Sequence, residues 1–247
     1  MALDGWDLDG RTALVTGGAG GIGAAICRDL AALGARVVVA DLDELAACRL
    51  AAELPDATAA GVDLDQPEQV AGLVHTVGTV DILVNNAGVS TVERFVQSDL
   101  SSWDRLWRIN LRAPMQLAHG LLPGMLARGW GRLVFISSDG ARAGSGGEGV
   151  YSACKAGLLG LTKTLAREAA AAGVTSNAVC PGPTDTPMLR AVAAENPALV
   201  EKLARAIPLG RLGQPADVAA MVSFLCTNRA GYLTGQTFSV SGGITMH

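Results

Sequence analysis

The sequence of 247 residues has few of the residues that build disulfide frameworks, metal sites or nucleic-acid interfaces. Its five cysteines are odd in number and never form a C-x-x-C pair, which is typical of unpaired, mostly buried thiols in a reducing compartment. Its three histidines, His75, His119 and His247, lie far apart, so we expect no metal site. Lys and Arg number 19 against 23 Asp and Glu, and a formal net charge of −4 lacks the basic excess of nucleic-acid-binding proteins.

Long apolar runs are also missing. No stretch reaches the roughly 18 consecutive apolar residues that a membrane-spanning helix needs, and the acidic N-terminal segment does not read as a signal peptide. We therefore expect a cytoplasmic protein that binds neither membranes nor nucleic acid. Apolar residues make up 49% of the chain, which is enough for a large core, and the 31 glycines indicate tight turns and close backbone approaches.

Short β-branched runs alternate with longer Ala-rich segments of helical period. Most of the runs are continuously apolar, as in strands buried on both faces of a parallel sheet. The alternation predicts one α/β domain over residues 1–247, a doubly wound Rossmann-type fold with a mostly parallel seven-stranded sheet and helices on both faces. The predicted strands are Thr12–Thr16, Arg36–Ala40, Ala59–Val62, Asp81–Asn85, Arg132–Ser137, Thr175–Val179 and Thr237–Val240, and the clearest predicted helices are Ile22–Leu33, Trp103–Ala127 and Ser152–Ala172.

A glycine-rich loop, Gly17–Gly23, joins the first predicted strand to the first predicted helix. Without side chains, the backbone of such a loop can approach a pyrophosphate, and the following helix start offers N–H groups and a positive dipole end. A strand before the loop and a helix after it are what a dinucleotide-binding fingerprint requires, whereas glycines alone indicate only a tight turn.

The next predicted strand runs into Asp41. A carboxylate at this position accepts hydrogen bonds from the adenosine ribose hydroxyls and repels a 2′-phosphate. No basic residue follows in Leu42-Asp43-Glu44, so the sequence predicts NAD rather than NADP as the cofactor. The alternative for Asp41 is a cap at the start of the next helix.

Tyr151 and Lys155 begin a predicted helix and share one face, because they are four residues apart. An ammonium about 4 Å from a phenol is worth roughly 4 kcal/mol at an effective dielectric of ~20. We expect it to lower the phenol pKa by up to about three units, before burial raises that pKa again. A phenol tuned in this way exchanges a proton with an alcohol or a carbonyl near neutral pH.

The Tyr–Lys spacing alone is ordinary, and neighbouring polar residues make it informative. Ser138 ends an apolar strand at the sheet edge where functional groups gather, while Ser137 beside it is expected to face away. Asn110 interrupts a long apolar helix pattern, so its amide is either satisfied locally or holds a water beside Lys155.

Together these motifs resemble the short-chain dehydrogenase/reductase family over nearly the whole chain. The resemblance implies hydride transfer between a nicotinamide cofactor and a secondary alcohol or ketone. Tyr151 would be the acid/base, Lys155 would lower its pKa, Ser138 would orient the substrate oxygen and Asn110 would complete a water-mediated proton relay. The segments that carry the resemblance are Thr16–Gly23, Asp63-Leu64, Asn85–Gly88, Asn110, Ser138, Tyr151, Lys155, Pro181-Gly182 and Thr186. The cofactor-binding residues that it implies are Gly17, Gly21, Ile22, Gly23, Asp41, Leu42, Asp63, Leu64, Asn86, Ala87, Gly88, Tyr151, Lys155, Pro181, Gly182, Thr184 and Thr186.

Several segments are similar to dehydrogenases of alicyclic hydroxyacyl-CoA thioesters, such as 2-hydroxycyclohexanecarboxyl-CoA, and to 3-oxoacyl thioester reductases of the same family. The alternative substrate is a sugar, a polyol or another small secondary alcohol. An alternative from another class is a dinucleotide-binding sensor without catalysis, which would have no need of all four catalytic residues. Arg142 and Arg190 are either partners of an anionic substrate group or solvated surface arginines.

The resemblance also implies a mobile cover over the substrate at about residues 187–210. It further implies that the helices within 103–127 and 152–172 form dimer interfaces, so we expect a homotetramer. The stretches 53–61 and 66–80 are short, which predicts a trimmed helix beside the sheet.

Overall fold

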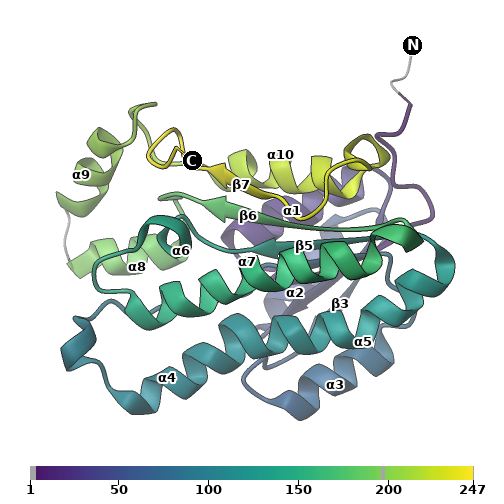
Figure 1. The fold of residues 1–247 in the computed structure, drawn as a ribbon, viewed down its shortest axis with the longest axis horizontal. Coiled ribbons are helices and arrows are strands. Elements are labelled where there is room, and N and C mark those ends of the chain that lie inside the picture. The colour runs from purple at the N-terminus through teal and green to yellow at the C-terminus, as the bar shows by residue number, and fades with distance from the viewer. Residues whose placement is uncertain (1–3, 196–197, 247) are drawn as a thin grey trace.

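The computed structural model describes residues 4–195 and 198–246 (Figure 1). In this part of the chain seven strands form one sheet in the order β3-β2-β1-β4-β5-β6-β7, and every pairing is parallel. The order reverses beside β1, and such a switch point opens a crevice at the carboxyl ends of the strands. The strands are β1 Thr12–Thr16, β2 Arg36–Asp41, β3 Ala57–Gly61, β4 Ile82–Asn85, β5 Gly131–Ile136, β6 Val174–Pro181 and β7 Thr237–Val240.

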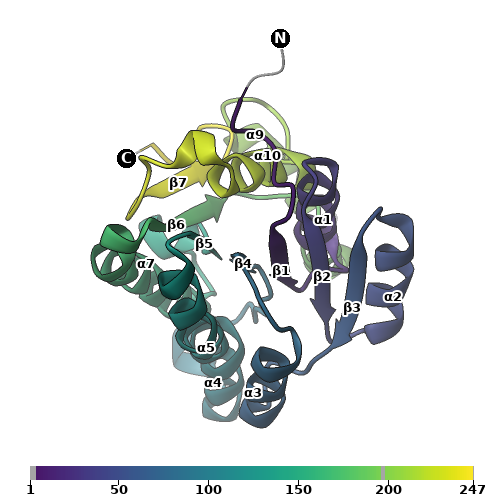
Figure 2. The same ribbon diagram turned by 90° about the vertical axis from the view of Figure 1, so that its right-hand side faces the viewer.

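Helices cover both faces of the sheet (Figure 2). One face packs against α1, α2 and α10, and the other packs against α3, α5 and α7. The α-helices are α1 Gly21–Ala32, α2 Glu44–Glu53, α3 Pro67–Thr76, α4 Leu100–Trp107, α5 Ala113–Arg128, α6 Gly140–Ala143, α7 Gly149–Ala169, α8 Pro187–Glu195, α9 Ala198–Ala206 and α10 Pro215–Cys226. Single-turn 3-10 helices lie at Phe95–Gln97, Ala170–Ala172 and Asn228–Ala230, and a π-helical turn lies at Arg108–Arg112.

The central strands divide their side chains between two cores. In β1, Ala13 and Val15 face the core under α1 and α10, while Leu14 faces the core under α5 and α7. This alternation follows from the period of two in a strand, and it explains why the central strands are apolar without interruption. The predicted strands are confirmed to within two residues at each end.

One predicted helix is broken. The apolar pattern over residues 103–127 predicted a continuous helix, but α4 and α5 are separated by the π-helical turn at Arg108–Arg112. Pro114 is the physical reason, because a proline lacks the N–H that would bond the carbonyl four residues earlier and its ring pushes that carbonyl aside. That carbonyl belongs to Asn110, so the interruption falls on a predicted site residue.

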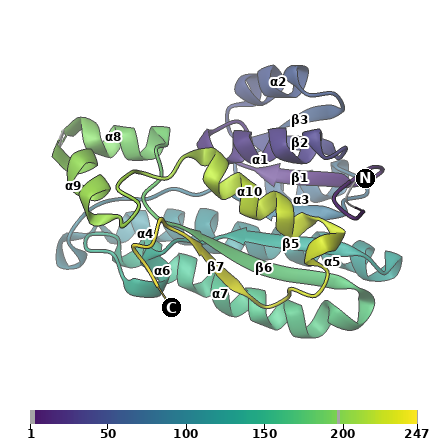
Figure 3. The same ribbon diagram turned by 90° about the horizontal axis from the view of Figure 1, so that it is seen from above.

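Helices α2 and α3, which lie in or beside the two stretches predicted to be short, have ten residues each. Helices α8 and α9 form a separate layer beyond the carboxyl ends of the strands (Figure 3). These two helices lie in the segment at about residues 187–210 that was predicted to cover the substrate. Residues 196–197 of this segment lie outside the described part of the chain. Among the described residues, no helix is both long enough and apolar enough to cross a membrane.

Candidate active site

A cavity of about 1020 Å³ lies at the carboxyl ends of the strands. Its walls come from the glycine loop, the ends of β2 to β6, the start of α7, and helices α8 and α9. Small-molecule sites usually enclose about 300–1,000 Å³. The cavity is therefore large enough for an extended ligand together with a second, smaller molecule.

The glycine loop is a close-packed turn with one open position. A Cβ added at Gly23 would stand 2.0 Å from the carbonyl oxygen of Gly17, and Gly17 itself has a φ of +60°. At Gly20 an added Cβ would meet nothing within 4 Å, and this residue caps α1 without any side-chain hydrogen bond. The loop thus leaves free space beside the uncapped start of α1, which fits a phosphate group of a dinucleotide.

Asn86 fastens the glycine loop to the end of β4. Its amide nitrogen donates to the carbonyl oxygens of Thr16 at 2.9 Å and of Gly17 at 3.0 Å. Its backbone N–H, like that of Ala87, donates to the Thr16 hydroxyl. The side chain steadies the loop, and Asn86 and Ala87 also line the cavity.

Asp41 stands at the outer end of the cavity, where the sequence predicts the adenosine ribose. Its Oδ2 accepts from the N–H of Ala19 at 3.0 Å, and its Oδ1 accepts from the N–H of Asp43 at 3.1 Å. Asp43, not Asp41, caps α2, because its side chain accepts from the N–H of Ala46. The capping alternative for Asp41 is therefore wrong.

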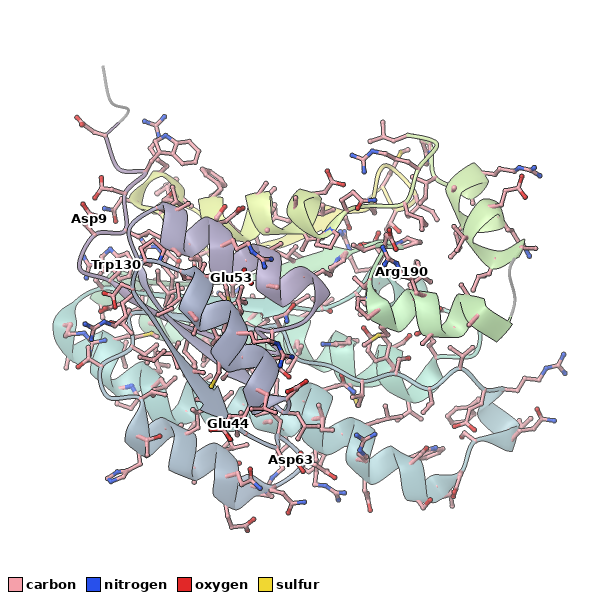
Figure 4. The ribbon with its side chains drawn as sticks, turned by 180° about the vertical axis from the view of Figure 1, so that it is seen from behind. Asp9, Glu44, Glu53, Asp63, Trp130 and Arg190 are labelled. Atoms are coloured by element: carbon pink, nitrogen blue, oxygen red, sulfur yellow. The ribbon has the colours of Figure 1, made fainter. Side chains whose placement is uncertain are left out.

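Asp63, labelled in Figure 4, follows β3 and lines the same cavity. Its Oδ1 accepts from the N–H of Asp65 at 2.9 Å. Leu64 beside it is buried, and Leu42 is exposed, but both line the cavity. This end of the cavity therefore carries two carboxylates and apolar side chains.

Tyr151 and Lys155 lie on the first turns of α7 and both line the cavity. The hydroxyl of Ser138, which follows β5, lies near enough to the Tyr151 hydroxyl to lower its pKa, and both residues line the cavity. The Lys155 ammonium lies 5.8 Å from the centre of the Tyr151 ring and donates to the carbonyl of Ile136 at 2.9 Å. Ser137, which was expected to face away, also lines the cavity, and its buried hydroxyl donates to the backbone carbonyl of Lys155 at 2.8 Å.

Burial controls the ionisation of this pair. It raises the pKa of Tyr151 to about 12, with a further rise from the charge of Glu148, and the Ser138 hydrogen bond only partly offsets both. Burial also lowers the pKa of Lys155 to about 8. The predicted lowering of the Tyr151 pKa by Lys155 is therefore wrong, because Lys155 is not among the groups that shift this pKa and desolvation of the phenolate sets its direction.

The side-chain ends of Asn110 and Lys155 both lie beside Gly88. A Cβ added at Gly88 would stand 2.9 Å from Oδ1 of Asn110 and 3.0 Å from Nζ of Lys155, so only a glycine fits between them. Three hydrogen bonds hold the Asn110 amide, because Nδ2 donates to the carbonyls of Val89 and Leu106 and Oδ1 accepts from the N–H of Val89. Its backbone carbonyl has no N–H to accept from four residues later, because residue 114 is a proline.

The segment after β6 forms another wall of the cavity. Thr184 donates to the carbonyl of Gly182 at 2.9 Å, and the Thr186 hydroxyl accepts from the N–H of Leu189 at 3.3 Å. A Cβ added at Gly21 would lie 3.2 Å from Cγ2 of Thr186, so this wall nearly touches the glycine loop. Pro181 and Ile22 also line the cavity.

Neither predicted arginine partner lines the cavity. Arg190, labelled on α8 in Figure 4, makes two hydrogen bonds to Asp185 at 2.7 and 2.9 Å. Arg142 donates to the Ser239 hydroxyl at 2.7 Å. Sequence reasoning instead missed Glu148, a carboxylate in the cavity wall three residues before Tyr151, although that spacing is visible in the sequence.

The sequence model of the family described as Enoyl-(Acyl carrier protein) reductase matches residues 17–245. The chain is 44% identical to an acetoacetyl-CoA reductase of Rhizobium meliloti (strain 1021), over 94% of this chain and 98% of that one. It is 40% identical to a 2,3-dihydroxy-2,3-dihydro-p-cumate dehydrogenase of Pseudomonas putida, over 97% and 96% of the two chains.

Solved structures give the same picture. A short chain dehydrogenase/reductase family protein superposes with a TM-score of 0.90 at 39% identity, covering 96% of this chain and 98% of that one. A structure described as an NAD(P) dependent gluconate 5-dehydrogenase from Beutenbergia cavernae, with NADP bound at low occupancy, superposes with a TM-score of 0.90 at 36% identity, covering 97% and 98%.

Proposed function

The chain belongs to the short-chain dehydrogenase/reductase family, an oxidoreductase family acting on secondary alcohols and ketones, and on that premise we propose an NAD-dependent enzyme that uses Tyr151 as its acid/base. One observation carries the proposal. Ser138, Tyr151 and a buried Lys155 stand together in the wall of the cavity that the glycine loop also lines, and the Ser138 hydroxyl acts on the Tyr151 phenol.

The proposed mechanism assigns the proton to the chain. When bound, the nicotinamide cofactor accepts a hydride in alcohol oxidation and supplies one in ketone reduction. Ser138 holds the substrate oxygen, and Tyr151 takes its proton in oxidation and returns it in reduction. Lys155 places a positive charge beside the phenolate, and the backbone carbonyl of Asn110 accepts from a water that links Lys155 to solvent.

The proposed cofactor is NAD, and Asp41 supports this choice. A 2′-phosphate bound near Asp41 would face a carboxylate that is not paired with any cation among the described residues. The cations that line the cavity are Arg105 and Lys155, and Lys155 lies at the Tyr151 end. The NADP bound in a related structure makes a direct comparison of the two cofactors the necessary check.

The first candidate substrate is a hydroxyacyl thioester, such as a 3-hydroxyacyl-CoA. The similarity to an acetoacetyl-CoA reductase supports it, and so do the apolar side chains of Met188, Val192 and Leu199 in the cavity wall. The second candidate is a diol or polyol. It is favoured by the carboxylate of Glu148 beside Tyr151 and by the similarity to a dihydrodiol dehydrogenase.

The same proposal includes three expectations from the family. Helices α8 and α9 would close over the substrate, the protein would be cytoplasmic, and it would assemble as a homotetramer. A cover of this kind excludes water from the reacting groups and often limits turnover.

A panel of substrates tests the proposal. Secondary alcohols, diols, polyols and 3-hydroxybutyryl-CoA are offered with NAD or with NADP, and the reduced cofactor is followed by its absorbance. We expect a higher kcat/KM with NAD than with NADP for the preferred substrate. A preference for NADP would contradict the role of Asp41, and no turnover of any substrate would contradict the reaction itself.

A further inference from the structure

Glu148 is the N-cap residue of α7, but its carboxylate does not bind the start of that helix. Its side chain accepts from none of the first N–H groups of the helix. Its Oε1 accepts from the Ser90 hydroxyl at 2.8 Å, and its Oε2 accepts from the Ser145 hydroxyl at 2.6 Å. The two serines come from the loops after β4 and after α6, and they hold the carboxylate in the cavity wall.

The carboxylate keeps acceptor capacity for a ligand. Its two oxygens offer about four lone-pair sites, of which the two serines use two. No ion pair between the described residues involves Glu148. A half-buried carboxylate without a cation is best satisfied by further hydrogen-bond donors, and a neutral hydroxyl provides one.

Glu148 also lies beside the reacting groups. It is three residues before Tyr151, one turn away on the same helix start, and its charge acts on the Tyr151 phenol. A ligand that contacts Ser138 and Tyr151 can therefore also reach Glu148, since all three residues line the same cavity. An anionic group at this place would be repelled.

We propose that Glu148 binds a second hydroxyl group of the substrate, on the carbon next to the one that is oxidised. The substrate class is then a vicinal diol, and in the reverse direction an α-hydroxy ketone. The second hydroxyl donates its hydrogen to the carboxylate and is not consumed. The inference rests on the proposed reaction and chooses the second of its two substrate classes.

The test compares two alcohols that differ only in the second hydroxyl, cis-cyclohexane-1,2-diol and cyclohexanol. The variants are Glu148→Met, which removes the acceptor oxygens, and Glu148→Gln, which keeps one of them. Glu93→Gln is the matched control, because Glu93 lies on the neighbouring loop but does not line the cavity. Removing the Glu148 charge acts on Tyr151 with either alcohol, so the measured quantity is the ratio of the two kcat/KM values.

We expect the wild-type chain to prefer the diol, and Glu148→Met to reduce that preference roughly 10- to 100-fold, the value of a hydrogen bond to a charged group. Glu148→Gln should lose less, and Glu93→Gln should keep the wild-type ratio. Thermal unfolding of each variant shows whether the fold survives the change.

Three results overturn the inference while leaving the proposed reaction intact. They are equal use of both alcohols by the wild type, an unchanged ratio in a folded Glu148→Met, and turnover of 3-hydroxybutyryl-CoA without any turnover of the diol. No reduction of NAD with any of these substrates would contradict the proposed function, and the inference with it.

Discussion

Two glycines of the same loop, Gly23 and Gly20, should respond differently when each is replaced by alanine: the first change should lower the Tm, and the second should weaken cofactor binding. A Cβ at Gly23 would stand 2.0 Å from the carbonyl oxygen of Gly17, where contacts under 3.0 Å essentially never occur. The loop must then move by about 1 Å, and overpacking of this kind costs about 1–3 kcal/mol. Because 1 kcal/mol shifts the Tm of a chain of this size by about 2–4 °C, Gly23→Ala should lower the Tm by roughly 2–12 °C.

Gly20→Ala is the matched substitution. Gly20 has an ordinary extended φ of −103°, and its added Cβ meets nothing within 4 Å. The loss of a glycine N-cap and the reduced freedom of the unfolded chain offset each other, so the Tm should stay within about 2 °C. The methyl group does enter the space proposed for the phosphates. We therefore expect the Kd for NAD to rise roughly tenfold, as for the loss of one charge-assisted hydrogen bond.

Differential scanning fluorimetry gives the Tm of both variants, and calorimetric titration with NAD gives the Kd. Equal falls in Tm for the two variants would refute the assignment of Gly23 as the packed position. An unchanged Kd in Gly20→Ala would show that the open space beside α1 does not hold the cofactor.

Three further predictions concern cofactor choice, pH and assembly. Asp41→Ser should lower the ratio of kcat/KM for NAD over NADP by about tenfold or more, because it removes a charge of the same sign as the 2′-phosphate; an unchanged ratio would contradict the proposed contact. Because burial raises the pKa of Tyr151 to about 12, its phenol is protonated near neutral pH. Alcohol oxidation needs the phenolate, so its kcat/KM should rise with pH from neutral to alkaline solution. Ketone reduction needs the phenol, so its kcat/KM should not rise. Equal pH profiles in both directions would count against Tyr151 as the base. Light scattering should give the mass of four chains of 25.2 kDa each, and a monomer would remove the expected tetramer.

The sheet could be predicted from the sequence because each central strand is apolar without interruption and each is followed by a helix-period segment. Ala13, Leu14 and Val15 show why, because they pack alternately into the two cores on the two faces of the sheet. The break at Arg108–Arg112 was missed, because the apolar period continues through it and only Pro114 signals it.

The site was predictable where a motif names its residues, and less so where burial or distance decides. Placing Tyr151 and Lys155 in one cavity follows from their spacing, but the direction of the Tyr151 pKa shift depends on burial, which spacing does not reveal. Arg142 and Arg190 have suitable charges, but partners elsewhere hold them. Only the bonds of Glu148 to Ser90 and Ser145 show where its carboxylate lies.

The role of Tyr151 is tested most directly by Tyr151→Phe, which removes the hydroxyl and keeps the ring that is packed in the cavity wall. The measurement is kcat/KM for NAD reduction with the best alcohol of the panel, beside the Kd for NAD. The account predicts a fall of about 10²- to 10⁴-fold in kcat/KM, the usual contribution of a general acid/base, with the Kd nearly unchanged. Hydride transfer that survives within a few-fold in this variant would contradict it.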